Sequence, residues 1–192
     1  MITTRRLVFL MCFVLFALKI NAQIDGLSAG LAFSSGVNYD NLTTGNPGVF
    51  AKVYVELDKK LHVVPSIVAF SPYKFKTAGF SNELRTYMFL GDVDAVYGLY
   101  KDKSLRFMGF AGLNTTMIIS KWKILEPNPG SDLENKSYIK PGLNLGGAFQ
   151  LYVDDNFDAY ISLKYIVSEL DQFVINVGAI YYLGGKHRKG SW

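Results

Sequence analysis

Apolar and polar residues alternate along most of the chain beyond residue 22, and no stretch there has a helical apolar period of useful length. In residues 157–165 the odd positions are Phe, Ala, Ile, Leu and Tyr, whereas the even positions are Asp, Tyr, Ser and Lys. Successive side chains of a strand point to opposite faces, so this pattern predicts strands that are apolar on one face only. We expect eight: Leu27–Ser35, Val49–Leu57, Leu61–Ser71, Arg85–Tyr100, Leu105–Ile119, Gly142–Val153, Phe157–Val167 and Phe173–Leu183.

The connections between these segments alternate between short and long. Short polar turns occupy Asp58–Lys60, Lys101–Ser104 and Asp154–Asn156, and longer segments occupy Gly36–Gly48, Pro72–Leu84 and Ser120–Pro141. Bacterial outer-membrane barrels have an even strand number, short periplasmic turns and long outer loops. The order therefore predicts an all-β fold, an eight-stranded antiparallel up-and-down transmembrane β-barrel over residues 23–183. The last connection, Ser168–Gln172, departs from the pattern because it is short yet falls on the outer side.

One predicted strand contains a proline. Pro65 lies within Leu61–Ser71 and has no N–H to donate to a ladder. We therefore expect a local β-bulge at this position.

The first 22 residues have the three-part organisation of a secretory signal peptide. Met1–Arg6 contains two arginines, Leu7–Leu18 is an unbroken apolar run, and Ala22 offers a small residue for cleavage before Gln23. A membrane-spanning helix needs about 20 apolar residues, and this run is shorter and ends at Lys19. No later stretch is long and apolar enough for such a helix, so a membrane could be crossed only with strands.

Charge and cysteine content narrow the possible functions. The predicted leader contains three basic residues and no acid, so its removal leaves 17 basic against 16 acidic residues. A nearly neutral chain has no electrostatic footprint for nucleic acid. The only cysteine is Cys12, inside the leader, so we expect neither a disulfide nor a cysteine ligand or nucleophile after cleavage.

The polar face contains charges of nearly balanced sign. Three cations and four anions fall on it: Lys52, Glu56, Asp92, Asp94, Arg106, Asp158 and Lys164. The interior of an eight-stranded barrel is just wide enough for side chains to fill it, and a balanced set can pair across it. We therefore predict an interior ion-pair network. A proton or ion path through Asp92 and Asp94 is the alternative, which the absence of an aqueous channel in such narrow barrels disfavours.

Aromatic residues of the apolar face fall near both ends of the predicted strands. One set is expected at the periplasmic rim (Tyr97, Phe107, Phe157 and Tyr181) and the other at the outer rim (Phe33, Tyr87, Tyr165 and Phe173). Two aromatic girdles that flank an aliphatic band are typical of outer-membrane barrels. In the alternative, a soluble sandwich or barrel, the same rings would form the core.

No catalytic or metal-binding motif is visible. His62 and Ser66 are predicted to face inward, but four residues of strand separate them by roughly 13 Å, too far for a hydrogen bond. His187 is isolated near the C-terminus. We predict a protein that is not an enzyme and that holds no cofactor and no metal.

Two predicted outer loops interleave aromatic residues with lysines: Tyr73, Lys74, Phe75 and Lys76 in one, and Lys121, Trp122 and Lys123 in the other. Such loops suit a partner protein, or the anionic sugars and phosphates of the outer leaflet. Alternatively, they are strand extensions with ordinary lipid-headgroup contacts. Residues 184–192 are expected to form a short basic periplasmic tail.

Several segments resemble small outer-membrane barrels. These are Asn21-Ala22-Gln23, the hairpin Val49–Phe70, the glycine-rich Gly109–Gly112 and Gly142–Gly147, and the final strand Asn176–Leu183. On these segments the chain resembles the PorT-like and OmpX-like barrels of Bacteroidetes-type bacteria. The resemblance implies an outer-membrane location and insertion by the barrel-insertion machinery, and some PorT-like relatives assist secretion. The predicted function is a non-enzymatic barrel in outer-membrane lipid that stabilises the envelope or binds a partner. The alternative is a soluble exported lipocalin-like barrel with an apolar ligand in its lumen.

Overall fold

The computed structural model describes residues 23–35, 38–39, 42–43, 46–76, 83–102, 104–123 and 135–183. The leader predicted for residues 1–22, the tail predicted for 184–192 and parts of the three long connections lie outside this range. In the part of the chain that is described, no helix is long and apolar enough to span a membrane.

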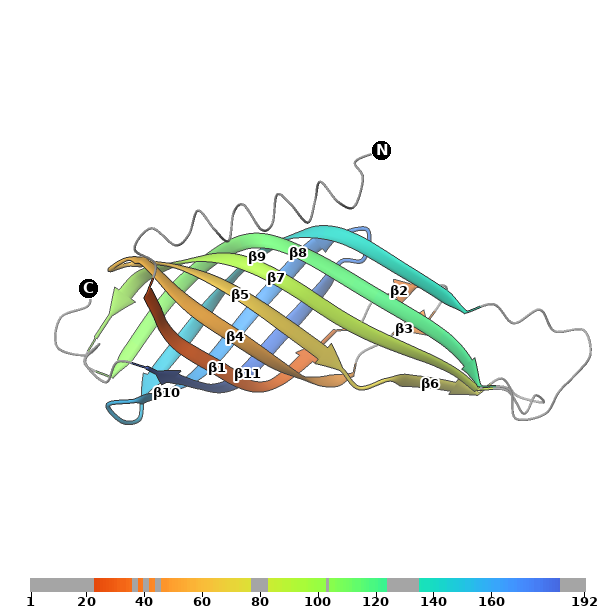
Figure 1. The fold of residues 1–192 in the computed structure, drawn as a ribbon, viewed down its shortest axis with the longest axis horizontal. Coiled ribbons are helices and arrows are strands. Elements are labelled where there is room, and N and C mark those ends of the chain that lie inside the picture. The colour runs from red at the N-terminus through yellow and green to blue at the C-terminus, as the bar shows by residue number, and fades with distance from the viewer. Residues whose placement is uncertain are drawn as a thin grey trace, which may run out of the picture.

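Nine strands form one sheet that closes on itself (Figure 1). They are β1 (Gln23–Ser34), β4 (Pro47–Asp58), β5 (Leu61–Phe70), β6 (Tyr73–Lys76), β7 (Glu83–Lys101), β8 (Leu105–Lys123), β9 (Lys136–Tyr152), β10 (Phe157–Ser168) and β11 (Gln172–Tyr182). A two-stranded hairpin, β2 (Asn38–Tyr39) with β3 (Leu42–Thr43), lies within the first long connection. Because β5 and β6 both pair with β7, one after the other along its length, they occupy one position in the wall. The structure thus confirms the predicted closed eight-stranded antiparallel barrel.

The register fixes the stagger of the wall. We traced registered partners from strand to strand, starting at Ser34 of β1 and continuing once around the barrel. The path returns to β1 at Gln23, which is 11 residues from Ser34. One of these residues, Asp25, is the extra residue of a β-bulge and does not count toward the shear. The shear is therefore 10, which for eight strands gives a tilt of about 40° and an interior that side chains can fill.

The solvent exposure of side chains alternates along the strands as predicted, and the apolar side chains lie on the outer face of the barrel. The burial of β11 alternates residue by residue, and so does most of β4. Ile67, Leu113 and Leu145 on the outer face are 64–68% exposed, whereas Lys164 and Asn176 inside are each 1% exposed. The wall therefore presents hydrocarbon outward and polar groups inward.

Several strands extend beyond their predicted ends. β7 begins at Glu83, β8 continues to Lys123, β9 begins at Lys136, and β6 lies in a segment expected to be a loop. These extensions pair with one another, from Ser120↔Lys136 to Lys76↔Glu83, and form a sheet that rises past β10 and β11 (Figure 1). We call this the protruding sheet: β6, residues 83–87, 119–123 and 136–140. Its lowest residues, 85–87 and 119, belong to the predicted strands, whereas the residues above them lack apolar alternation, which is why the sequence pattern did not reveal them.

The bulge expected at Pro65 is not formed. Pairing of β5 with β7 runs past Pro65 without a shift, whereas pairing with β4 stops at Lys52↔Ser66 and resumes in the same register at Val55↔Val63. A missing N–H removes ladder pairs on one side of a strand without requiring an extra residue. The register shifts of β4 and β1 lie instead at Glu56/Asp58 and Ile24/Gly26.

Candidate functional site

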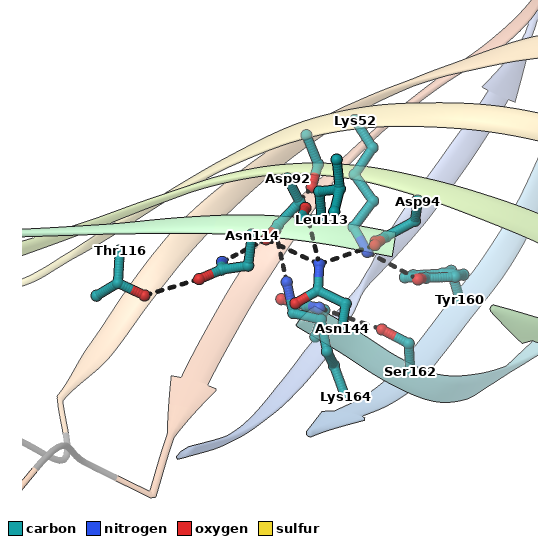
Figure 2. Close-up of polar contacts among 12 residues, drawn as sticks. Lys52, Asp92, Asp94, Leu113, Asn114, Thr116, Asn144, Tyr160, Ser162 and Lys164 are labelled. Carbon is teal, nitrogen blue, oxygen red and sulfur yellow. Dashed lines mark hydrogen bonds and ion pairs between the residues drawn. The ribbon is translucent and has the colours of Figure 1, made fainter. Parts of the chain in front are cut away.

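A hydrogen-bonded cluster centred on Asp92 occupies the middle of the lumen (Figure 2). Lys164 of β10 donates to Asp92 Oδ2 at 2.5 Å, and Ser66 of β5 donates to the same oxygen at 3.1 Å. Asn114 and Asn144 donate to Asp92 Oδ1 at 2.6 and 3.0 Å. All five residues are at least 94% buried. Four different strands thus supply one carboxylate with four donors, and such hydrogen bonds stabilise a buried charge.

A second carboxylate and a second lysine lie beside this group (Figure 2). Asn144 Nδ2 also donates to Asp94 Oδ1 at 2.8 Å and so bridges the two aspartates. Lys52 Nζ donates to the phenol oxygen of Tyr160 at 2.9 Å and lies 5.0 Å from the centre of that ring. The ammonium is therefore held by a hydrogen bond and by a cation–π contact.

Apolar layers close the lumen on both sides of the central cluster. On β7 the aspartates lie between Leu90 and Val96, and on β5 Ser66 lies between Val64 and Val68, all of them buried. The same order holds on β8, β10 and β11, where the buried apolar residues are Phe110, Ile118, Tyr160, Ile166, Val174 and Ile180. Within the described residues, buried apolar side chains thus lie on both sides of the cluster along the barrel axis.

The seven charges predicted to form one network fall into separate groups. Asp92, Asp94 and Lys164 join the central cluster, and Lys52 binds Tyr160. Arg106 and Asp158 lie instead at the end of the short turns, where they line a cavity of about 160 Å³ together with Lys101, Gln150 and Tyr152. Glu56 is half-buried and is the registered neighbour of His62 on β5, near the same end. Alternation predicts the face of a residue but not its height in the barrel, so the sequence alone could not divide the seven residues in this way.

His62 and Ser66 engage different partners. His62 Nε2 lies 3.4 Å from Asp25 Oδ2, and Asp25 faces inward because of the register shift between Ile24 and Gly26. Ser66 donates to Asp92. No group of three or more His, Cys, Asp or Glu side chains in the described chain is placed to hold a metal.

The predicted girdle aromatics lie on the outward face. Phe33, Tyr97, Phe157, Phe173 and Tyr181 are 41–51% exposed, and Tyr87, Phe107 and Tyr165 are half-buried there. They form cross-strand pairs toward both ends: Phe157–Tyr181 and Tyr165–Phe173, with ring centres 4.9 and 4.6 Å apart, and Phe107–Phe149 at 4.8 Å. Phe149 was not predicted, because only the strand register places it opposite Phe107.

The lysines and aromatics predicted to lie on outer loops are strand residues of the protruding sheet. Lys74 is the registered partner of Arg85, and Arg85 is the registered partner of Lys121, so three cations form one row across β6, β7 and β8. Tyr73 and Trp122 are half-buried. The side chains of Phe75, Lys76 and Lys123 lie outside the described residues. Arg85 was missed because its neighbours in this row are far away in sequence.

Several solved structures of outer-membrane barrels resemble this chain. Ail of Yersinia pestis, in complex with the heparin analogue sucrose octasulfate, aligns with a TM-score of 0.60 at 17% identity, over 83% of this chain and 97% of Ail. A major outer membrane protein of Thermus thermophilus aligns with 0.59 at 12% identity, over 82% and 99%. Neisserial surface protein A aligns with 0.58 at 14% identity, over 84% and 98%. No protein-family model and no curated protein matches the chain.

These similarities confirm the small eight-stranded barrel fold, and at such identities they show the fold alone. The narrower resemblance to PorT-like proteins stays a prediction. The binding role of the outer segments also stays a prediction.

Proposed function

We propose that the chain is exported by its leader, spans the outer membrane as a sealed barrel and presents the protruding sheet to a partner outside the cell, without catalysing a reaction. The short turns then face the periplasm, and the protruding sheet lies beyond the outer leaflet. The length asymmetry of the connections supports this orientation.

The observation that carries the proposal is the inverted distribution of polarity. Every strand of the barrel wall except the β6 extension has a large apolar side chain that is at least 42% exposed, while Lys164 and Asp92 are buried. A soluble monomer rarely exposes apolar patches larger than a few hundred Å². A continuous apolar belt with aromatic pairs toward both ends suits hydrocarbon between two headgroup layers.

The lumen argues against the alternative of a soluble ligand carrier. A lipocalin-like protein needs an apolar cavity within its barrel. Here, the described lumen holds a buried polar cluster in its middle and buried apolar side chains on both sides of it. The cavity at the short-turn end is lined by Lys101, Arg106 and Asp158, a charged set unsuited to an apolar ligand.

The protruding sheet is the part best placed to meet a partner. Its strands carry exposed lysines, and β6 and the first residues of β9 form its two edges. If the PorT-like resemblance holds, the partner is a component of a secretion system. Cross-linking on intact cells, with and without residues 73–76, tests for a protein bound there.

The membrane assignment is tested with one matched pair of substitutions on β9. Leu145 and Ile139 lie on the same face and are each 64% exposed, so burial alone predicts equal effects. Six residues of strand, roughly 20 Å, separate them, which places Ile139, the registered partner of Met117, near the outer edge of the apolar belt. In a bilayer, Leu145→Arg is expected to destabilise the barrel by about 2–4 kcal/mol and Ile139→Arg by about 0–1 kcal/mol. Equal, small effects of both in guanidinium unfolding in lipid vesicles would refute the membrane assignment.

A further inference from the structure

Three cations stand side by side on the outward face of the protruding sheet. Lys74↔Arg85 and Arg85↔Lys121 are directly registered pairs, so all three side chains leave the sheet on one face. Lys74 and Lys121 are exposed, and Arg85 is half-buried. An acid contacts the row: Arg85 Nε donates to Glu83 Oε1 at 2.7 Å. The four residues together keep a net charge of +2.

Such a row is unfavourable by itself. Side chains of directly opposed residues on neighbouring antiparallel strands lie about 5 Å apart, and like charges in these positions destabilise the sheet. Glu83 offsets one of the two like-charge contacts at most. An anion placed over the row would neutralise the remainder.

The height of the row points to the source of that anion. Counting up the outward face of β7 the residues are Phe89, Tyr87 and Arg85, and on β8 they are Met117, Ile119 and Lys121. The cations are thus the first outward residues beyond the aromatic and aliphatic belt. That is where the headgroups of the surrounding lipid lie once the belt is in hydrocarbon.

We infer that Lys74, Arg85 and Lys121 form a binding site for the phosphate groups of an anionic glycolipid in the outer leaflet. The inference rests on the proposed membrane location and goes beyond it, because it names a ligand class and three residues. The three side chains project from the outward face, away from the barrel axis, so they meet lipid that surrounds the barrel. A soluble partner arriving from above would meet the strand tips instead. Arg85 would contribute planar donors and the lysines compact point charges to the phosphate oxygens.

The test uses the full barrel in detergent micelles and bisphosphorylated lipid A as the probe, with bound lipid counted by native mass spectrometry. Lys74→Glu/Lys121→Glu reverses two charges of the row and keeps the Arg85–Glu83 contact. Its matched control is Lys59→Glu/Lys60→Glu, the same change of charge in the exposed β4–β5 turn at the opposite end. Folding of each variant is checked beforehand by heat-modifiable migration on gels.

We expect the row variant to bind lipid A about tenfold more weakly than the unmodified protein, since exposed ion pairs are individually modest. The control variant should bind as the unmodified protein does, and dephosphorylated lipid A should bind weakly to all three. Equal lipid A binding by the row variant and the control would overturn the inference, as would equal binding of the dephosphorylated lipid. If inorganic phosphate at the same concentration displaced lipid A, the row would be a site for free anions, and the inference that its ligand is a lipid would be refuted.

The two proposals fail separately. A folded barrel that shows the Leu145→Arg penalty yet binds lipid A without regard to its phosphates refutes only the glycolipid site. A barrel in which Leu145→Arg costs nothing refutes the membrane location, whatever lipid A does in micelles.

Discussion

The central ion pair offers the sharpest test of how this barrel is held together. Replacing Asp92 by Asn removes the carboxylate and leaves Lys164, which is 1% exposed, without the ion pair seen in the structure. Replacing Lys164 by Met removes the ammonium but leaves Asp92 with its three neutral donors, Ser66, Asn114 and Asn144. The two substitutions therefore leave different charges behind: an ammonium without a counter-charge in one variant, and a carboxylate that keeps three hydrogen-bond donors in the other.

The magnitudes follow from these partners. Loss of one member of a buried ion pair costs about 3–5 kcal/mol when the remaining charge is left without compensation. Asp92→Asn should approach this range because the ammonium loses its counter-charge. Lys164→Met should cost less, about 1–3 kcal/mol, since the hydrogen bonds that remain still favour the charged carboxylate. The double variant should be more stable than the sum of the two losses implies, because neither buried charge is left alone.

Equilibrium unfolding by guanidinium in lipid vesicles, followed by circular dichroism, gives the four free energies of this double-mutant cycle. The exposed pair Lys140–Glu169 serves as a control, and Glu169→Gln should cost less than about 1 kcal/mol. Strictly additive losses in the cycle would contradict the reasoning. So would an Asp92→Asn variant as stable as Glu169→Gln.

Two further substitutions test the lumen by the same unfolding measurement. Tyr160→Phe removes the phenol that accepts from buried Lys52 at 2.9 Å and should cost about 1.5–3 kcal/mol; an unchanged free energy would show that Lys52 finds another acceptor. Gly112→Ala would place a Cβ 2.3 Å from Asp94 Oδ1 and should cost about 1–3 kcal/mol. Gly91→Ala meets nothing within 4 Å and should stay within about 0.5 kcal/mol of the unmodified protein. Equal effects at Gly112 and Gly91 would show that Asp94 and its neighbours can move aside to accommodate the added methyl group at little cost in stability.

Much of the fold could be predicted from the sequence. The period-2 pattern located eight strands and separated their faces, because in an antiparallel wall each residue has only two directions in which to point. It did not reveal β6 or the extensions of β7, β8 and β9. Above the apolar belt both faces meet polar surroundings, so backbone pairing continues there without alternation in the side chains.

Less of the candidate site than of the fold could be predicted from the sequence. Lys164 and Asp92 could be placed inside, but their pairing depends on a register between strands 72 residues apart. Asn114 and Asn144 lie on strands separated by the longest connection, and only the registers of β7 with β8 and of β8 with β9 bring both to the same carboxylate. The Lys74–Arg85–Lys121 row arises in the same way.

The sequence by itself determined the local quantities: extended conformation, which face of each strand is apolar, and the alternation of short with long connections. These depend on neighbours one or two residues apart. Only the tertiary structure decided the shear of 10, the height of each side chain in the lumen and the partners it meets across the barrel. The physical reason is that a shift of two residues between strands preserves every inward and outward face, yet moves each side chain to a new set of neighbours.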